Sequence, residues 1–354
     1  MFKVETLPAE HGDCLWIEYG DEHSSRKILI DSGPGKTSRH LKDRLNNLSE
    51  SERRFELLIL SHYDDDHLGG ILEYFKSGYP EIKFGDVWFN GWHHIHDVSK
   101  DLLGADQGEK FSNLVLNKKW PWNEAFGGKA VFFSESGKLP EIELDGEMKL
   151  TLLSPTPNKL AILKDKWDEE ITANDKEPGY GEEEAPGDIL GGGEELTVDV
   201  VQELAAEDSS LDISPSNGGS IAVLAEFGGK RALLAADAHS ETLETALRKI
   251  VSNGNKLKLD LFKVSHHGSK HNISNRLMRL IDCPRFLVST NGKKFSHPDD
   301  QAIAKLVCEE SKPKELYFNY RTKFNQNWDN KELKEVFNYS PIYSLSGQTT
   351  VILK

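Results

Sequence analysis

Residue types that bind divalent metal ions are concentrated in one short segment. His62, Asp64, Asp66 and His67 lie within six residues of one another, directly after the apolar run 55–60. Imidazole nitrogens and carboxylate oxygens bind Zn²⁺, Mn²⁺ and Mg²⁺, and a short loop after a strand can bring such atoms together. We expect residues 62 and 64 to serve one metal position and residues 66 and 67 a neighbouring one. The alternative for this segment alone is a solvated acidic turn whose Asp caps a helix N-terminus.

Three further clusters reduce the weight of that alternative. Each follows an apolar run, and together they contain Asp237, the pair His266 and His267, and His297. A lone Asp after a strand is most often a turn residue, but a His pair followed by Gly-Ser in a tight turn is less readily explained by packing. Four clusters of ligand-type residues therefore occur at the ends of four separate apolar runs.

These clusters need strands and helices to position them. In the first part of the chain, hydrophobic periodicity predicts an antiparallel meander at 2–5, 14–19 and 27–31, helices at 38–48 and 69–75, and strands at 55–60 and 86–90. In the second part it predicts strands at 149–153, 259–264, 286–289, 315–319 and 349–353, a hairpin at 220–235, and helices at 241–251 and 301–308. This order favours a layered α/β architecture, in which two mixed sheets pack face to face with helices outside.

Length and composition restrict the function. The chain has 354 residues, which at roughly 150 residues per domain is about two domains or one large domain with insertions. Its net charge of −15 argues against broad adhesion to nucleic acid. No run approaches about 18 apolar residues and no signal-peptide pattern opens the chain, so we expect neither a membrane span nor export. The three cysteines form no CxxC pair, which favours a reducing, cytoplasmic location.

Two regions have the character of insertions, at about 91–148 and 158–212. Within the second, residues 165–212 hold 17 acidic residues against two lysines, a composition typical of an exposed or partly disordered loop. The simplest role is solubility. The alternatives are an electrostatic gate that repels long DNA and a surface that binds a basic protein partner.

The motifs, taken in order, resemble a known family. The string S-H-Y-D-D-D-H-L-G-G at 61–70 resembles the H-x-[H/D]-x-D-H signature of the metallo-β-lactamase superfamily. K-V-S-H-H-G-S and the later S-H-P are similar to the variant found in ComEC/Rec2-like DNA-internalisation domains of the competence type, and H-G-D-C-L-W-I-E-Y, I-L-I-D-S-G, N-G-G-S-I-A-V-L and L-L-A-A-D-A also fit that variant. The resemblance implies one αββα four-layer sandwich over residues 1–354, interrupted by the two insertions. It also implies a dinuclear metal site and hydrolysis at the phosphodiester end of the superfamily.

The resemblance further implies a role for each matching position. His62 and Asp64 match ligands of the first metal, and Asp66 and His67 match ligands of the second. The other matches are Asp237 for the bridging carboxylate and either His266 or His267 for the remaining second-site ligand, which spacing does not decide.

Two departures from the family pattern bear on the metal. Asp64 stands where many relatives have His, and Asn217 stands where many have the third His of the first site. With more oxygen and less imidazole, that site should select zinc less strongly and admit Mn²⁺ or Mg²⁺ more readily. We therefore expect two divalent ions, Zn²⁺ or Mn²⁺ with Mg²⁺ as a further option, and a first site that is the weaker.

The predicted activity is metal-dependent hydrolysis of a phosphodiester, with a nucleotide or a short or single-stranded nucleic acid as substrate. A dinuclear centre generates hydroxide near neutral pH, and Asp66 orients that nucleophile. The non-ligand histidine of the 266–267 pair, together with His297, stabilises the oxyanion or protonates the leaving oxygen. Two alternatives stay open: hydrolysis of an ester, lactone or thioester on the same fold, and a non-catalytic metal-binding regulatory protein.

A few neighbouring residues invite interpretation. Asp31 is either a partner of a ligating His or a turn cap. Lys263 flanks the His pair and reads best as a solvated surface lysine, with phosphate binding as the alternative. The run His93-His94-Ile95-His96 is either a surface loop or part of a third metal or substrate-binding site.

Overall fold

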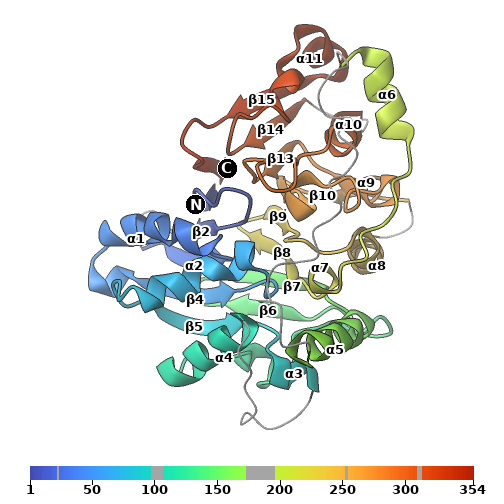
Figure 1. Ribbon diagram of the computed structural model, residues 1–354. Coiled ribbons are helices and arrows are strands. Elements are labelled where there is room, and N and C mark those ends of the chain that lie inside the picture. Colours follow the sequence, from blue (N-terminus) through green and yellow to red (C-terminus); the bar gives the residue numbers. More distant parts are fainter. Residues whose placement is uncertain (22–23, 97–106, 173–195, 252–253, 309–312) are drawn as a thin grey trace.

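The computed structural model of the protein describes residues 1–21, 24–96, 107–172, 196–251, 254–308 and 313–354. Within these residues two large β-sheets pack against each other and helices cover their outer faces (Figure 1). The predicted layered α/β fold with two mixed sheets is confirmed. The two chain ends lie close together because the first and last strands are paired.

The first sheet has the strand order β16-β1-β2-β3-β4-β5. Its strands are β16 (Thr349–Leu353), β1 (Phe2–Thr6), β2 (Leu15–Tyr19), β3 (Arg26–Ile30), β4 (Arg54–Ile59) and β5 (Lys83–Trp88). The predicted antiparallel meander is present in β1 to β3, whereas β3, β4 and β5 run parallel. Three parallel carboxyl ends therefore meet at one edge of this sheet.

The second sheet has the order β15-β14-β13-β11-β9-β8-β7-β6. Its strands are β15 (Tyr339–Tyr343), β14 (Lys314–Phe318), β13 (Arg285–Val288), β11 (Leu261–Lys263), β9 (Lys230–Leu234), β8 (Ala222–Phe227), β7 (Met148–Ser154) and β6 (Glu141–Leu144). β8 and β9 form the predicted hairpin. Because β9, β11 and β13 are parallel neighbours, the residues that follow them emerge at the same edge. A short parallel pair, β10 (Leu257–Lys258) and β12 (Ile281–Asp282), lies beside this sheet.

Strand alternation divides the apolar residues between two clusters. Ile28 and Ile30 point into the core between the sheets, while Leu29 points to the outer cluster beneath the helices. The helices are α1 (Ser38–Asn46), α2 (Asp65–Lys76), α3 (Trp92–His96), α4 (Gln107–Lys118), α5 (Pro157–Thr172), α6 (Val198–Ala206), α7 (Pro215–Gly218), α8 (Ser240–Ile250), α9 (Asn275–Met278), α10 (Asp300–Cys308) and α11 (Lys331–Phe337). Both amphipathic helices near the N-terminus, α1 and α2, pack on the outer face of the first sheet.

The structure corrects the sequence interpretation of helix α2 and of the acidic segment. Helix α2 begins at Asp65 rather than near residue 69, since Asp64 has extended backbone angles and the first turn is acidic, as suits a helix N-terminus. Asp66 and His67 are thus helical residues. The acidic segment is also less exposed than predicted: Trp167 and Val201 at its two ends are fully buried. Its middle, 173–195, lies outside the described residues.

Among the described residues, no helix combines the length and apolar character that crossing a membrane requires. The predicted insertion boundaries, 91–148 and 158–212, stay predictions.

One glycine of α2 offers a test of how closely this helix must approach the first sheet. A Cβ at Gly70 would lie 2.0 Å from the carbonyl oxygen of Ser32, and the Gly70 N–H donates a 2.6 Å hydrogen bond to Gly33. In an open helix Ala would be favoured over Gly by about 1 kcal/mol. Here we expect Gly70→Ala to lower the free energy of unfolding by about 1–3 kcal/mol in urea denaturation. Gly137→Ala, whose Cβ meets only contacts of 3.5 Å or more, is the control; equal stability of both variants would show that α2 can shift freely.

Candidate metal centre

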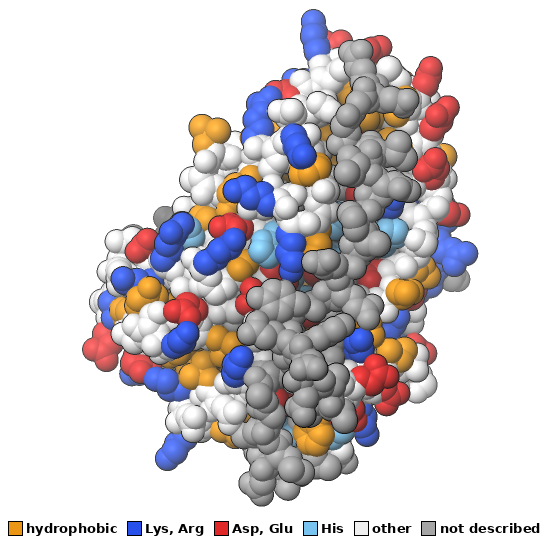
Figure 2. Space-filling model, viewed as in Figure 1, with side chains coloured by type: hydrophobic (Ala, Val, Ile, Leu, Met, Phe, Trp, Pro, Cys, Tyr) orange, Lys and Arg blue, Asp and Glu red, His pale blue; other side chains and the backbone are white. Residues whose placement is uncertain are grey.

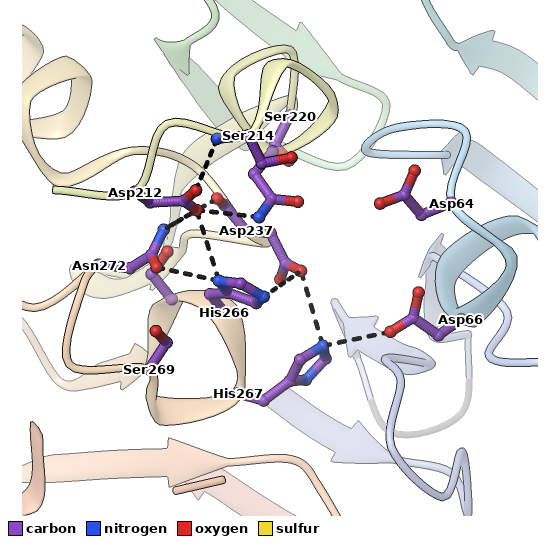
Figure 3. Close-up of polar contacts among 12 residues, drawn as sticks. Asp64, Asp66, Asp212, Ser214, Ser220, Asp237, His266, His267, Ser269 and Asn272 are labelled. Carbon is purple, nitrogen blue, oxygen red and sulfur yellow. Dashed lines mark hydrogen bonds and ion pairs between the residues drawn. The ribbon is translucent and has the colours of Figure 1, made fainter. Parts of the chain in front are cut away.

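Four side chains from three segments of the chain converge where the two sheets meet: two come from the first turn of α2, one follows β9 and one follows β11. Nε2 of His67 lies 3.2 Å from Oδ2 of Asp237 and 4.0 Å from Oδ2 of Asp66. Nε2 of His267 lies 3.7 Å from the same oxygen of Asp66 and 3.6 Å from that of Asp237 (Figure 3). Ligands bonded to one divalent ion at about 2.1 Å are separated by about 3–4 Å. These four residues therefore have the spacing of a metal site.

The ligand-type atoms at this point lack hydrogen-bond partners within the described part of the chain. They are Nε2 of His62, His67 and His267, and Oδ1 of Asp64 and Asp237. Buried polar atoms in proteins are almost always hydrogen-bonded. A divalent ion would satisfy both the imidazole nitrogens and the carboxylate oxygens, so the residues present fit a metal centre. Two groups with such geometry are His62, His67 and Asp237, and Asp66, His67 and His267.

Each of these imidazoles is held by its other nitrogen. Nδ1 of His67 lies 2.8 Å from Asp31, and Nδ1 of His267 lies 2.8 Å from the carbonyl oxygen of Ser289. Nδ1 of His62 lies 2.9 Å from the Ser61 hydroxyl and 3.2 Å from that of Ser220. Partners of this kind fix the ring and direct Nε2 inward. For Asp31, the geometry agrees with the interpretation as a partner of a candidate ligand.

Charge and burial act differently on the two central imidazoles. Burial lowers the pKa of His267 well below its ordinary value, which keeps the ring neutral and ready to bind a metal. For His67, burial also lowers the pKa, but the carboxylates of Asp237 and Asp31 outweigh it and raise the pKa well above 6.5. A metal ion at Nε2 of His67 must therefore displace a proton, which makes metal affinity fall as the pH is lowered.

The predicted first site is less complete. Nε2 of His62 lies 3.5 Å from Oδ2 of Asp64, and that oxygen accepts a 3.0 Å hydrogen bond from Ser216. Asn217 does not direct its amide nitrogen to them, because it donates a 2.9 Å hydrogen bond to Asp212. The structure thus brings His62 and Asp64 together, while the amide nitrogen of Asn217 is bonded to Asp212.

The adjacent histidines occupy different positions. While His267 lies among Asp66, His67 and Asp237, His266 turns its Nδ1 to Asn272 at 3.0 Å and to Asp212 at 3.4 Å. Its Nε2 lies 3.9 Å from Asp237 (Figure 3). Both histidines have left-handed backbone angles, with φ of 45° and 55°, so a tight turn gives the neighbouring rings different partners while Nε2 of each faces the Asp237 carboxylate. The geometry favours His267 as the candidate ligand and leaves His266 beside the centre.

Asp212 is a site residue that the sequence interpretation missed. Its carboxylate accepts hydrogen bonds from the backbone N–H of Ser214 at 2.8 Å and from Asn217 and Asn272, each at 2.9 Å. Burial alone would raise the pKa of Asp212, but His239 and His266, whose nitrogens lie 3.6 Å and 3.4 Å from its oxygens, hold this pKa well below its ordinary value. The acidic run that precedes Asp212 concealed it, and the only sequence signal is the D-x-S-P turn that follows.

Lys263 was interpreted as a surface lysine, and the structure shows that this is wrong. Its side chain is fully buried and forms an ion pair with Oδ2 of Asp13. The other oxygen of Asp13 lies 3.6 Å from Nδ1 of His267. This buried pair therefore lies next to Nδ1 of His267, away from the surface that a substrate could reach.

The remaining predicted residues lie apart from the four central ligands. His297 is buried, its ring centroid is 5.5 Å from that of His266, and its Nε2 has no hydrogen-bond partner among the described residues. His93 and His94 pack edge-on against Trp122, and His96 pairs with Asp168 at 2.8 Å. In the described part of the chain, the 93–96 run contributes to no group of three metal-ligating atoms. Its contacts are those of a packed helix.

Comparison with known families gives the same reading of the fold. The model of the metallo-beta-lactamase superfamily matches residues 7–292. The chain belongs to the metallo-β-lactamase superfamily. This superfamily is mostly hydrolytic, and the member described here has His/Asp clusters able to hold divalent metal.

Similar solved structures are also metallo-β-lactamase-fold proteins. One is the crystal structure of the metallo-beta-lactamase fold protein YhfI from Bacillus subtilis. Its sequence is 13% identical to this chain, the match covers 99% of each of the two chains, and the TM-score is 0.41. Another is the MIM-2 metallo-beta-lactamase, whose sequence is 12% identical to this chain. The match covers 84% of this chain and 85% of that protein's chain, with a TM-score of 0.31. No curated protein sequence matches.

The different positions of His266 and His267 predict different effects on metal content. His267→Ala removes an imidazole from the central group, so we expect the purified protein to lose roughly one metal equivalent per chain. His266→Ala should retain its metal, since Nδ1 of His266 is held by Asn272 and Asp212 and its Nε2 lies 3.9 Å from the Asp237 carboxylate. Elemental analysis of both variants, purified in parallel without chelator, measures this. Loss of metal from His266→Ala alone would reverse the assignment.

Proposed function

We propose that this member of the superfamily is a metal-dependent phosphodiesterase of the ComEC/Rec2-like type, with a nucleotide or a short single strand as substrate. The observation that carries the proposal is the pair formed by His266 and Asp212. A buried carboxylate and Asn272 hold Nδ1 of His266, while its Nε2 faces Asp237 at the candidate metal centre. An imidazole in this place suits proton transfer to a leaving oxygen.

The candidate ligands are Asp66, His67, Asp237 and His267 for one ion, and His62 and Asp64 with Asp237 for the other. Zn²⁺ or Mn²⁺ bound there would supply a hydroxide nucleophile and charge stabilisation for a phosphoryl oxygen. The chain itself provides the orientation of the ligands and two further imidazoles, His266 and His297. His266 donates the proton that an alkoxide leaving group needs, and His297 lies close enough to assist at the oxyanion.

A leaving-group argument favours a phosphodiester over a thioester. The alkoxide released from a nucleotide is strongly basic and needs a proton, whereas a thiolate leaves without one. Proton donation by His266 would therefore contribute little to thioester hydrolysis. Lactone or ester hydrolysis is the second candidate, and the observation in its favour is Asp64, which makes the first site richer in oxygen than a site of three histidines.

The first test is turnover of a simple phosphodiester. With Zn²⁺, Mn²⁺ or Mg²⁺ supplied in turn, we expect hydrolysis of bis(p-nitrophenyl) phosphate that falls more than about 100-fold in Asp237→Ala and Asp66→Ala. Lactone and p-nitrophenyl ester substrates run beside it. Faster lactone or ester turnover would favour the second candidate. Fully metal-loaded protein with no turnover of any substrate would favour a regulatory metal-binding protein.

The second test separates a positioning role of Asp212 from a purely structural one. Asp212→Asn keeps the shape but weakens the hold on His266, so we expect kcat for a dinucleotide to fall about 10- to 100-fold. The loss for bis(p-nitrophenyl) phosphate should be much smaller, because p-nitrophenolate leaves without a proton. Metal content and the unfolding midpoint are measured on the same samples. Equal losses for both substrates would remove the argument for proton transfer through His266.

A further inference from the structure

Three basic segments without acidic residues meet at the loop 9–13. Residues 34–42, 289–298 and 319–325 each contain Lys, two of these segments also contain Arg, and none contains Asp or Glu, in a chain whose net charge is −15. All three contact Glu10. Its carboxylate pairs with Lys36 at 2.6 Å, its carbonyl oxygen accepts a 2.7 Å hydrogen bond from Asn291, and its N–H donates to the Tyr320 hydroxyl at 3.2 Å. The fold thus gathers cationic segments that are far apart in the sequence.

The same loop touches the candidate metal centre on its other side. The N–H of Asp13 donates a 3.2 Å hydrogen bond to the carbonyl oxygen of Asp66, and a Cβ at Gly12 would lie 1.9 Å from that oxygen. His11 lies between the two sides. Burial lowers the pKa of His11, Asp66 raises it, and Lys294 and Lys36 lower it further, so the charges of the metal centre and of both lysines reach this ring.

Both lysines lie at the surface. The Lys36 side chain is 62% exposed, and Lys294 is exposed with its ammonium 4.7 Å from the ring centroid of Phe295. Phe295 in turn contacts His11 edge-on at 6.1 Å. Figure 2 shows Lys and Arg side chains grouped around histidine atoms near the middle of this face. Cations concentrated beside a site in an otherwise acidic protein attract anions to that site.

We propose that Lys36, Lys294 and His11 form a flanking-phosphate site, which binds a phosphate group of the substrate next to the one that is cleaved. This inference rests on the proposed phosphodiesterase function and narrows its substrate class to molecules with more than one phosphate. Lysine ammonium groups bind phosphate as point charges, and His11 can add a hydrogen bond. The phosphate belongs either to the backbone of a single strand or to a nucleotide polyphosphate, and the two sources share this chemistry.

Glu10 gives the site a built-in competitor. Without an anion, its carboxylate neutralises Lys36 through the 2.6 Å ion pair. An incoming phosphate has to share Lys36 with Glu10. Removal of the Glu10 charge should therefore strengthen phosphate binding, opposite in direction to removal of the lysines.

The test compares four metal-loaded, full-length proteins: the parent, Lys36→Gln/Lys294→Gln, Glu10→Gln, and Lys76→Gln/Lys331→Gln. The last is the matched control, because Lys76 and Lys331 are 81% and 88% exposed and each pairs with a Glu on its own helix. Fluorescence anisotropy follows binding of a short fluorescein-labelled phosphorothioate oligothymidylate as salt is raised. Unlabelled inorganic triphosphate competes in a second series.

We expect the Lys36→Gln/Lys294→Gln protein to bind the oligothymidylate about tenfold more weakly, with the slope of log affinity against log salt reduced by about 0.7, because one strand phosphate is no longer neutralised. Glu10→Gln should bind more tightly, and the control should match the parent. Effective competition by triphosphate identifies a nucleotide polyphosphate as the source, and weak competition identifies a strand. In turnover, the lysine variant should lose more kcat/KM for the oligonucleotide than for bis(p-nitrophenyl) phosphate.

Failure of this inference is distinct from failure of the proposed function. Parent-like affinity of the Lys36→Gln/Lys294→Gln protein, or no binding of either probe by the parent, would overturn the flanking-phosphate site even if bis(p-nitrophenyl) phosphate is cleaved. Lysine-dependent binding by a parent that cleaves no phosphodiester would support the site while rejecting the phosphodiesterase.

Discussion

The Asp31 carboxylate is the interaction on which the geometry of the candidate centre most depends. It accepts hydrogen bonds from the N–H and the hydroxyl of Ser61, both at 2.8 Å, and holds Nδ1 of His67 at the same distance. One buried side chain therefore ties the end of β3 to the end of β4 and to the first turn of α2. Ser32 adds a 2.7 Å hydrogen bond from its N–H to the carbonyl oxygen of His67. The close packing of Gly70 against the same turn follows, because α2 can start in this position only if its backbone lies directly on residues 32–33.

A second buried contact joins the other sheet to this frame. Asp13, in the loop after β1, forms an ion pair with Lys263 at the end of β11, and both side chains are almost fully buried. A buried pair of this kind is weakly stabilising overall, but loss of one partner is costly because a charge is left without compensation. Its main effect is geometric. It holds the N-terminal loop beside the turn that carries His267, and so places ligands from two sheets around one point.

Sequence patterns predicted the layered fold and singled out clusters of ligand-type residues that the structure brings together, but not the contacts that connect them. Apolar alternation located the strands, and the clusters at 62–67, 237 and 266–267 stood out because ligand-type residues recur at the ends of separate apolar runs. The choice between His266 and His267 was beyond sequence, since it depends on two successive left-handed residues in the turn. Lys263 was misread for a related reason: its burial depends on Asp13, which is 250 residues away in the chain. Long-range pairs of this kind leave no periodic signal.

Asp212 shows how one carboxylate can shape both halves of the centre. By accepting a hydrogen bond from Asn217, it holds the amide nitrogen at the position where many relatives have a third histidine. By facing Nδ1 of His266, it helps to hold that ring with its Nε2 toward Asp237. Asp212, which holds the Asn217 amide, thus also supports His266, the proposed proton donor. In the proposed function, the orientation of the Asn217 amide and the placement of His266 therefore both depend on this one buried carboxylate, and a histidine at position 217 would disturb both because it would compete for the same carboxylate.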